Sequence, residues 1–167
     1  MKPFFKKHPT ALCIALLFGL VVTGCISNIL KEKIPAFSNQ ISFTPPNSFT
    51  EIKSVYPSWK NNDTQNVILI ISNCDDNKYS PPYAYMIISE NIDTPQVESI
   101  KVDGIFLPKQ VAKQILGTVD EEAVEVQTFS FKHRNCVYIS ALSGKPNTIA
   151  KDFKNWKTFL KSIELKK

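Results

Sequence analysis

The stretch "AVEVQTFSFKHRNCVYISAL", residues 123–142, decides how this sequence folds. Its first half places Val124 and Val126 on one side of an extended chain and Phe129 and Phe131 on the other. The second half follows a polar break and alternates apolar residues on one face: Val137, Ile139 and Ala141. Alternation is typical of β-strands, and a short polar break is typical of a hairpin turn. We therefore predict a β-hairpin, with a bulge where the apolar residues of its first strand change sides.

Other segments upstream complete the predicted sheet. The run "VILIISN", residues 67–73, is continuously aliphatic and of strand length, which predicts a central strand buried on both faces. Residues 97–104 alternate and end at Asp103-Gly104, which predicts a further strand. We expect a short extended piece from residue 40, stopped by two prolines. Residues 56–66 are mostly polar, and we expect a loop there that carries Trp59.

Two segments can be interpreted either as helix or as strand. In residues 81–91, Ser80 followed by two prolines favours a short helix, whereas the Ile87-Ile88 pair favours a strand; we expect the helix. In residues 108–117, Pro108 at the start and Gly117 at the end suit a helix. The spacing to the next segment suits the arm of a hairpin that turns at residues 120–122.

The last element is an amphipathic helix. Asn147 is a good N-cap residue, and apolar residues then recur at spacings of three and four: Ile149, Phe153, Trp156, Leu160 and Ile163. Such a stripe should lie across the sheet and close the core. The predicted fold class is therefore α+β, with a mainly antiparallel sheet packed against a C-terminal amphipathic helix and one further helix, in a single domain of residues 40–167.

The first residues have the features of an export signal. Three lysines precede an apolar run at residues 11–22, which is shorter than the about 20 residues that a membrane span requires. The sequence Val22-Thr23-Gly24-Cys25 then resembles the lipobox of bacterial lipoproteins. The resemblance implies a signal peptide of residues 1–24, diacylglycerol and acyl groups on Cys25, and a tether of residues 25–39. The alternatives are an ordinary secretion signal and a buried core helix.

The residue after Cys25 bears on location. It is Ile26 rather than Asp, which in Gram-negative lipoproteins favours transfer to the outer membrane. The resemblance thus implies an anchor in the outer membrane that faces the periplasm.

Two cysteines remain once Cys13 leaves with the signal and Cys25 is lipidated. These are Cys74 and Cys136, each at a predicted strand position, in a compartment that permits disulfides. Neighbouring strands could bring them within bonding range, and we expect a bridge. The alternatives are two separate buried thiols, or a redox-active pair, although no C-x-x-C motif supports the latter.

Three stretches carry a wider resemblance: "NVILIISNC", "GTVDEEAVEVQTFSFKHRNCVYISAL" and "DFKNWKTFLKSI". Together they resemble small Gram-negative outer-membrane lipoproteins with the pattern "ISxC … CxY … FxxFLxSF". More distantly, the closing hairpin and helix are similar to the fold shared by the photosystem subunit PsbP and the envelope lipoprotein DcrB. The resemblance covers about residues 40–165 and rests on structural positions. It implies fold and location and transfers no active site.

The sequence offers little chemistry to an enzyme. His133 is the one histidine after the signal, and nothing nearby would orient it as a catalytic base. One histidine and two separated cysteines do not supply a zinc site, and no glycine-rich phosphate loop is present. The mature chain has 20 minus 3, or 17, basic residues against 15 acids, so its net charge of +2 does not indicate nucleic acid. We expect no catalytic residue, no metal and no cofactor.

One charged surface is a candidate binding site. Lys151, Lys154, Lys157 and Lys161 fall on one arc of the last helix, opposite its apolar stripe. The ordinary interpretation is a solvated outer face of the helix. The functional interpretation is a surface that contacts an anionic partner.

Two functions follow from these features. The first is a lipid-anchored, non-enzymatic domain that binds an envelope protein or an anionic envelope component. The alternative is a carrier of a small molecule or peptide, with a pocket between helix and sheet that Trp59, Tyr83 and Tyr85 would line.

Overall fold

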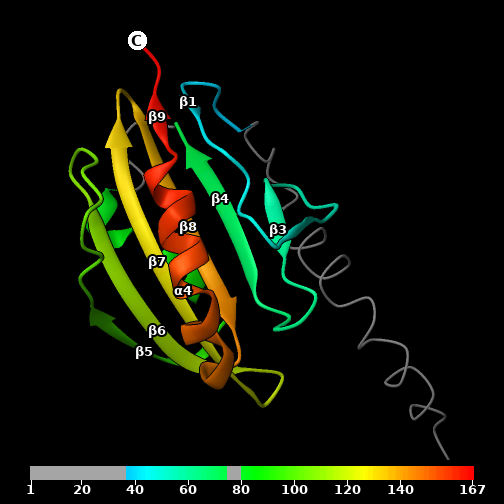
Figure 1. Cartoon of the computed structure of the whole chain (residues 1–167). Coiled ribbons are helices and arrows are strands. Elements are labelled where there is room, and N and C mark those ends of the chain that lie inside the picture. The colour runs from blue at the N-terminus through cyan, green and yellow to red at the C-terminus, as the bar shows by residue number, and fades with distance from the viewer. Residues whose placement is uncertain (1–36, 75–79) are drawn as a thin grey trace, which may run out of the picture. The chain divides into compact units, whose positions relative to one another are not determined.

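The strand β4, Val67–Asn73, has the bounds that the sequence predicts and lies inside the main sheet. The structure is a computed structural model and describes residues 37–74 and 80–167. Within them, seven strands form an antiparallel sheet in the order β2-β3-β4-β8-β7-β6-β5 (Figure 1). The other strands of this sheet are β2 (Thr50–Glu51), β3 (Ser58–Lys60), β5 (Asp93–Ser99), β6 (Val111–Val119), β7 (Glu122–His133) and β8 (Cys136–Gly144).

A second, two-stranded sheet joins the beginning and the end of the described chain. β1, Ile41–Ser42, pairs antiparallel with β9, Glu164–Leu165. Helical segments complete the fold: the 3-10 helix η1 (Pro81–Tyr83) and the helices α3 (Met86–Ser89) and α4 (Pro146–Lys161). The predicted α+β class, with a C-terminal helix on an antiparallel sheet, is confirmed.

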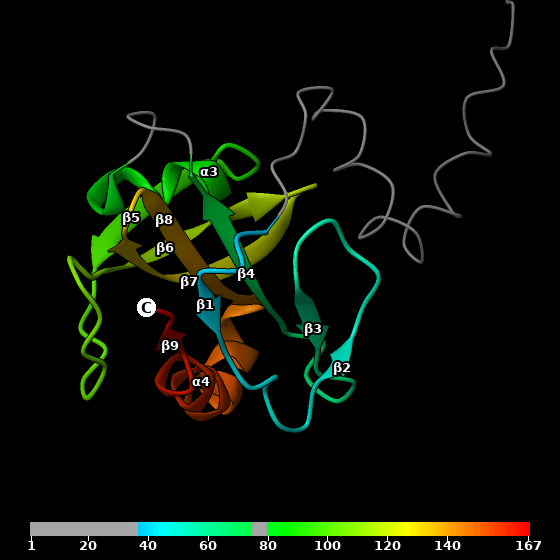
Figure 2. The ribbon, with the colours of Figure 1, turned by 90° about the horizontal axis from the view of Figure 1, so that it is seen from above.

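Helical segments cover both faces of the main sheet (Figure 2). On one face, α4 packs its apolar stripe over a large aromatic core, whose fully buried members include Phe129, Phe131, Tyr138, Trp156 and Phe159. The Trp156 indole Nε1 donates to Ser140 Oγ at 2.9 Å, so the largest buried ring has its polar atom satisfied. On the other face, Ala84, just after η1, packs against Val137 and Ile139 of β8.

Burial of both faces of the sheet explains the apolar pattern of the hairpin that the sequence predicts. β7 and β8 pair without interruption from Glu125 opposite Gly144 to His133 opposite Cys136. The predicted bulge is wrong. Val126 and Phe129 point to opposite faces simply because strand residues alternate, and both faces are buried. The apolar residues of β7 change sides because the face that other elements bury is not the same in the first and second halves of the strand.

Three other predictions need correction. The expected loop at residues 56–66 contains β3, and Trp59 is a core residue at 5% exposure. The strand predicted to end at Asp103-Gly104 instead ends at Ser99, and it begins earlier, at Asp93. Residues 81–91 are only partly helical, because η1 and α3 together leave Ala84 and Tyr85 between them.

Of the segment 108–117, residues 111–117 belong to the hairpin arm β6, Val111–Val119, and the helix interpretation is wrong. β6 turns into β7 after Val119, where Asp120 and Glu121 both have positive φ. Gly117 lies inside β6, close to Ile92 and the carbonyl of Asp93, so the glycine marks a close approach and not the end of a helix.

The N-cap of the terminal helix lies two residues before the predicted one. Lys145 is the N-cap residue and Pro146 opens α4, so Asn147 is not the cap. Proline is favoured at this first position because its missing N–H has no partner there and its φ suits a helix.

Candidate functional site

Four lysines lie along the outer side of α4, as predicted, and we call them the basic face: Lys151, Lys154, Lys157 and Lys161. Three of them are exposed, and Lys157 is half-buried. Within the described residues, none of the four forms an ion pair. The single acid of α4, Asp152, is 2% exposed, so the helix brings no counter-charge of its own to this surface.

Asp152 is held inside by a polar cluster from the loop before β4. Its Oδ1 accepts from Asn61 Nδ2 at 2.9 Å, and its Oδ2 accepts from Asn66 Nδ2 at 2.7 Å and from the hydroxyl of Thr64. Asn66 Nδ2 also lies 2.9 Å from the carbonyl oxygen of Thr148 in the first turn of α4. This set of donors accommodates a buried carboxylate and fixes α4 to the sheet.

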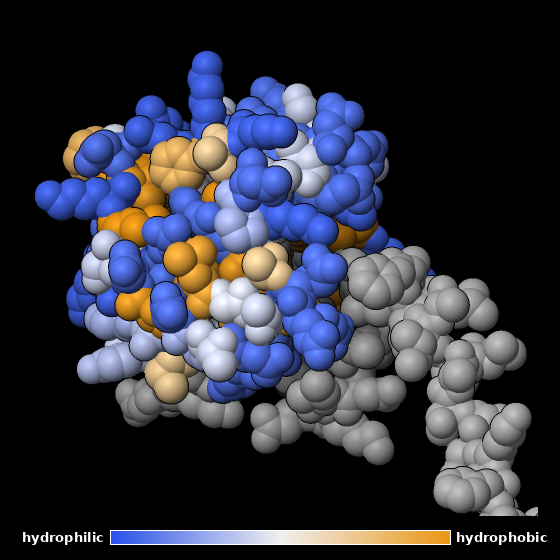
Figure 3. Space-filling model, turned by 90° about the horizontal axis from the view of Figure 1, so that it is seen from below, coloured by the Kyte–Doolittle hydropathy of each residue, from blue (hydrophilic) through white to orange (hydrophobic). Residues whose placement is uncertain are grey.

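A loop beside α4 presents an exposed aromatic ring. Phe106 is 92% exposed, whereas Val102 and Ile105, which precede it, are buried in the core and anchor the loop. A Cβ built on Gly104 would lie 3.7 Å from Lys161 Nζ, so this loop adjoins the basic face. The molecular surface seen from below is mostly hydrophilic, with hydrophobic side chains gathered in one part of it (Figure 3).

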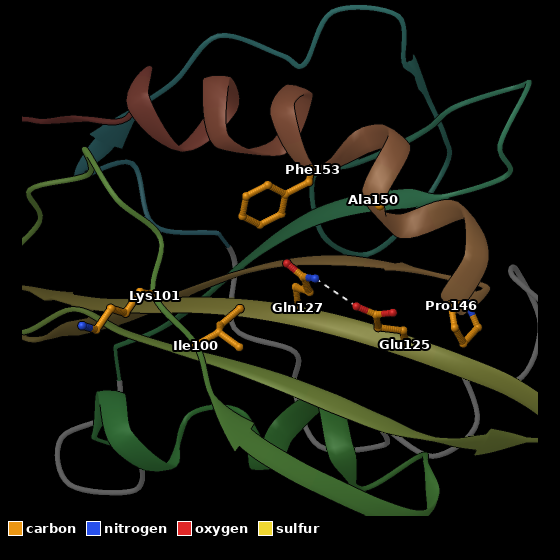
Figure 4. Close-up of a pocket in the computed structure, with 7 residues that line it drawn as sticks. All are labelled: Ile100, Lys101, Glu125, Gln127, Pro146, Ala150 and Phe153. Carbon is orange, nitrogen blue, oxygen red and sulfur yellow. Dashed lines mark hydrogen bonds between the residues drawn. The ribbon is translucent and has the colours of Figure 1, made fainter.

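A cleft of about 350 Å³ opens between α4 and the sheet (Figure 4). Its lining comes from the chain after β5, from β7 and from the N-terminal half of α4: Ile100, Lys101, Glu125, Gln127, Pro146, Ala150 and Phe153. The wall on the helix side is apolar, and the floor on β7 is polar. Such a combination is typical of a small-ligand pocket at the lower end of the usual size.

Two side chains of β7 rise from the floor of the cleft toward α4 (Figure 4). Glu125 is 8% exposed, and its Oε1 accepts from Gln127 Nε2 and from Gln114 Nε2, each at 2.9 Å. The other amide atom of Gln127, Oε1, is buried and has no hydrogen-bond partner in the described chain. The cleft therefore has a carboxylate that only neutral amides approach, and beside it a buried acceptor, Gln127 Oε1, that no described donor reaches.

The cysteine pair lies at the far end of the β7–β8 hairpin. Cys74 and Cys136 form a disulfide whose Cα atoms are 3.9 Å apart, as the sequence predicts. Nearby, the fully buried Tyr138 donates from its hydroxyl to Ser38 Oγ at 3.1 Å. Burial raises the pKa of Tyr138, and the hydrogen bond with Ser38 and the charge of Arg134 oppose that rise.

Other predicted site residues are not brought together. Trp59 belongs to the core under α4, whereas Tyr85 packs on the opposite face of the sheet and Tyr83 is 60% exposed, so the aromatic pocket expected from these three does not form. His133 ends β7, and its Nε2 lies 3.1 Å from the carbonyl oxygen of Lys166. Cys25 and the predicted signal peptide, residues 1–24, lie outside the described residues.

Two negative findings concern the described residues alone. Residues 37–74 and 80–167 contain no group of three or more histidine, cysteine, aspartate or glutamate side chains placed to hold a metal ion. No helix in the same ranges is long and apolar enough to cross a membrane.

Sequence reasoning missed the two buried acids. Asp152 lies inside the apolar stripe of α4, and its spacing from Ile149 and Trp156 is the signal that could have identified it as inward-facing. Glu125 alternates in phase with Phe129 and Phe131, which points it toward the face that α4 covers.

No protein-family profile and no curated protein matches this chain. Among solved structures, a protein of Bacteroides thetaiotaomicron overlaps 77% of the chain with a TM-score of 0.51 and 12% sequence identity. This chain spans 46% of that protein, and the likeness shows a shared fold.

Two further structures overlap less well. LpqN of Mycobacterium tuberculosis, described as involved in cell envelope biogenesis, has a TM-score of 0.47 and 11% identity over 80% of this chain and 87% of its own. The cyanobacterial PsbP of Synechocystis has a TM-score of 0.42 and 11% identity over 77% of this chain and 89% of its own. A PsbP is thus among the structures that this chain is similar to, at an overlap that carries no functional argument.

Proposed function

We propose that this chain is a lipid-anchored, non-enzymatic protein of the periplasmic face of the outer membrane, whose folded domain binds anionic phospholipid headgroups through the basic face. The observation that carries the proposal is the charge on α4. Lys151, Lys154 and Lys161 are exposed, and the only acid of the helix is buried.

Charge complementarity favours a lipid surface as the partner. A lysine near an anionic bilayer contributes about 1 kcal/mol, and the contribution falls with rising salt. The exposed ring of Phe106 adjoins this surface and offers an apolar group that could enter the headgroup layer.

The expected tether makes weak binding sufficient. Residues 26–38 reach at most ~45 Å when fully extended, so a lipid on Cys25 would keep the domain near the bilayer. A second, weak contact then becomes an intramolecular event at a high effective concentration.

The anchor has a direct test. Cells that express the full chain are fed a fatty-acid probe, and a Cys25→Ala variant serves as the control. We expect label on the wild-type protein and none on the variant. An unlabelled wild-type chain would remove the anchor from the proposal.

The basic face is tested separately, with the chain from residue 25 carrying Cys25→Ala so that no lipid contributes. Sedimentation with vesicles of phosphatidylethanolamine and phosphatidylglycerol is compared with phosphatidylcholine vesicles. We expect binding only to the anionic vesicles, and a loss on the order of tenfold or more for Lys151→Gln/Lys154→Gln/Lys161→Gln.

A matched control has the same change in net charge away from α4. Lys53→Gln/Lys166→Gln/Lys167→Gln removes three exposed lysines and should leave vesicle binding nearly unchanged. Equal losses in the two triple variants would mean that overall charge, and not the basic face, attracts the membrane.

A further inference from the structure

Beyond this membrane role, we infer that the cleft under α4 is a binding site for a small molecule that carries a primary ammonium group next to a short apolar chain. The ammonium would lie between Glu125 and Gln127, and the apolar chain would lie against Ile100, Ala150 and Phe153.

The first step of the argument is an uncompensated charge. Glu125 is only 8% exposed, yet no described cation lies within ion-pair distance of it. Lys101 lines the same cleft, but its ammonium points away from Glu125 (Figure 4). A buried carboxylate without a cation is costly, so a cation in the cleft would be stabilising.

The second step is a second acceptor beside the first. Gln127 Nε2 is directed to Glu125 Oε1, which leaves Gln127 Oε1 buried and without a partner in the described chain. A buried acceptor that lacks a donor costs about 1–3 kcal/mol. A ligand with two or more N–H donors would satisfy Gln127 Oε1 and Glu125 together.

The third step selects the type of cation. Glu125 Oε1 already accepts two amide N–H groups, so Oε2 is the oxygen left for a ligand. A guanidinium pairs best with both oxygens of a carboxylate in parallel, and this geometry is not open here. An ammonium is a compact charge with three donors and needs only one carboxylate oxygen.

The fourth step concerns the rest of the ligand. The wall on the helix side contains the Phe153 ring and the Ala150 methyl group, with Pro146 at one end. These groups favour an apolar chain beside the ammonium, and the aromatic ring can also attract the cation. A volume of about 350 Å³ limits the ligand to a small molecule.

Three probes of similar size test the inference on the chain from residue 25 with Cys25→Ala: n-butylammonium, n-butanol and butyrate. Binding is followed by NMR, through the side-chain amide signals of Gln114 and Gln127. We expect saturable shifts with butylammonium and none with the other two. Comparable binding of butanol or butyrate, or no saturable binding of butylammonium, would overturn the inference.

Two variants on β7 form a matched pair. Glu125→Gln keeps the shape of the side chain and removes the charge, and should weaken butylammonium binding by about tenfold or more. Glu122→Gln removes an exposed charge that pairs with Lys145 at 3.1 Å on the surface, and should leave the affinity unchanged. Unchanged affinity in Glu125→Gln would refute the site.

A third variant covers the case in which Glu125→Gln fails to fold. Ala150→Leu fills the cleft from the helix side, places a good helix former in α4 and leaves the carboxylate intact. It should keep the wild-type melting behaviour and lose butylammonium binding. Retained binding in a folded Ala150→Leu protein would place the ligand elsewhere. Because neither variant removes a lysine of the basic face, vesicle binding should persist in both, so this inference and the membrane proposal can fail independently.

Discussion

Asn66 Nδ2 lies 2.7 Å from Asp152 Oδ2, and this hydrogen bond joins the loop before β4 to the second turn of α4. Both residues are buried, so the pair fixes how the helix lies on the sheet. The basic face and the helix side of the cleft are both carried by that same helix, and each depends on its placement.

Removal of this carboxylate should destabilise the domain. Asp152→Ala leaves the donors of Asn61, Thr64 and Asn66 without their acceptor in a buried site. Each orphaned group costs about 1–3 kcal/mol, so we expect the free energy of unfolding to fall by at least about 3 kcal/mol. Urea denaturation measures the change, with Lys154→Ala on the exposed side of α4 as control. A loss below about 1 kcal/mol would show that the cluster is not energetically important.

Gly117 should not tolerate a side chain. A Cβ at this position would contact the Ile92 side chain and lie 2.6 Å from the carbonyl oxygen of Asp93, which is backbone and cannot rotate away. We expect Gly117→Ala to cost about 1–3 kcal/mol, as overpacking typically does. A thermal melt checks this. A neutral result would mean that β5 can shift away from β6.

The disulfide should stabilise the domain chiefly through the unfolded chain. Cys74 and Cys136 are 62 residues apart, and closing a loop of that length is worth roughly 4 kcal/mol in the chain-entropy model. Cys74→Ser/Cys136→Ser should lower the free energy of unfolding by up to that amount, and reduced wild-type protein should behave alike. Free thiols in the native protein, detected by iodoacetamide labelling, would contradict the bridge.

Tyr138 should make the fold sensitive to alkali. Burial raises its pKa above the ordinary 10.0, so the folded state holds the proton more tightly than the unfolded state. Its contribution is complete below pH 10.0 and is lost as the pH rises through the higher pKa of the folded protein. Melting temperatures between neutral and strongly alkaline pH should therefore fall less steeply in Tyr138→Phe than in the wild type.

Tyr138→Phe should also differ in stability from the wild type at neutral pH, which gives a reference for the alkaline measurements. Loss of the hydrogen bond to Ser38 should cost about 1 kcal/mol at neutral pH, before any ionisation. Parallel alkaline declines in the two proteins would assign the effect to other groups, among them Tyr56, whose pKa burial also raises.

Elements with a strong apolar pattern were predictable from the sequence. The run at residues 67–73 has no helical period, and its bounds match β4. The stripe of α4 shows in sequence because Ile149, Trp156 and Leu160 all point to the core. Local spacing determines such elements, since each residue's burial follows from its neighbours in the chain.

Residues whose burial depends on distant partners were not predictable. Trp59 looked like a loop residue because its neighbours are polar, yet it packs 5.5 Å, between ring centroids, from Phe159. Asn61 and Asp152 are both polar and become compatible with the interior only when they meet, 91 residues apart. Likewise, Glu125 and Gln127 line a cleft only because α4 packs above β7, and no local sequence pattern predicts that packing.

The pairing of Ile41 with Leu165 means that the domain cannot finish folding until its last residues have been synthesised. Because β1 leaves the ribosome among the first residues of the domain and β9 among the last, Ile41 stays uncovered until nearly the whole domain has been made and released. A bulky reporter fused directly after β9 would burden the closing step, so detection tags are better inserted at the solvent-facing turn between β6 and β7.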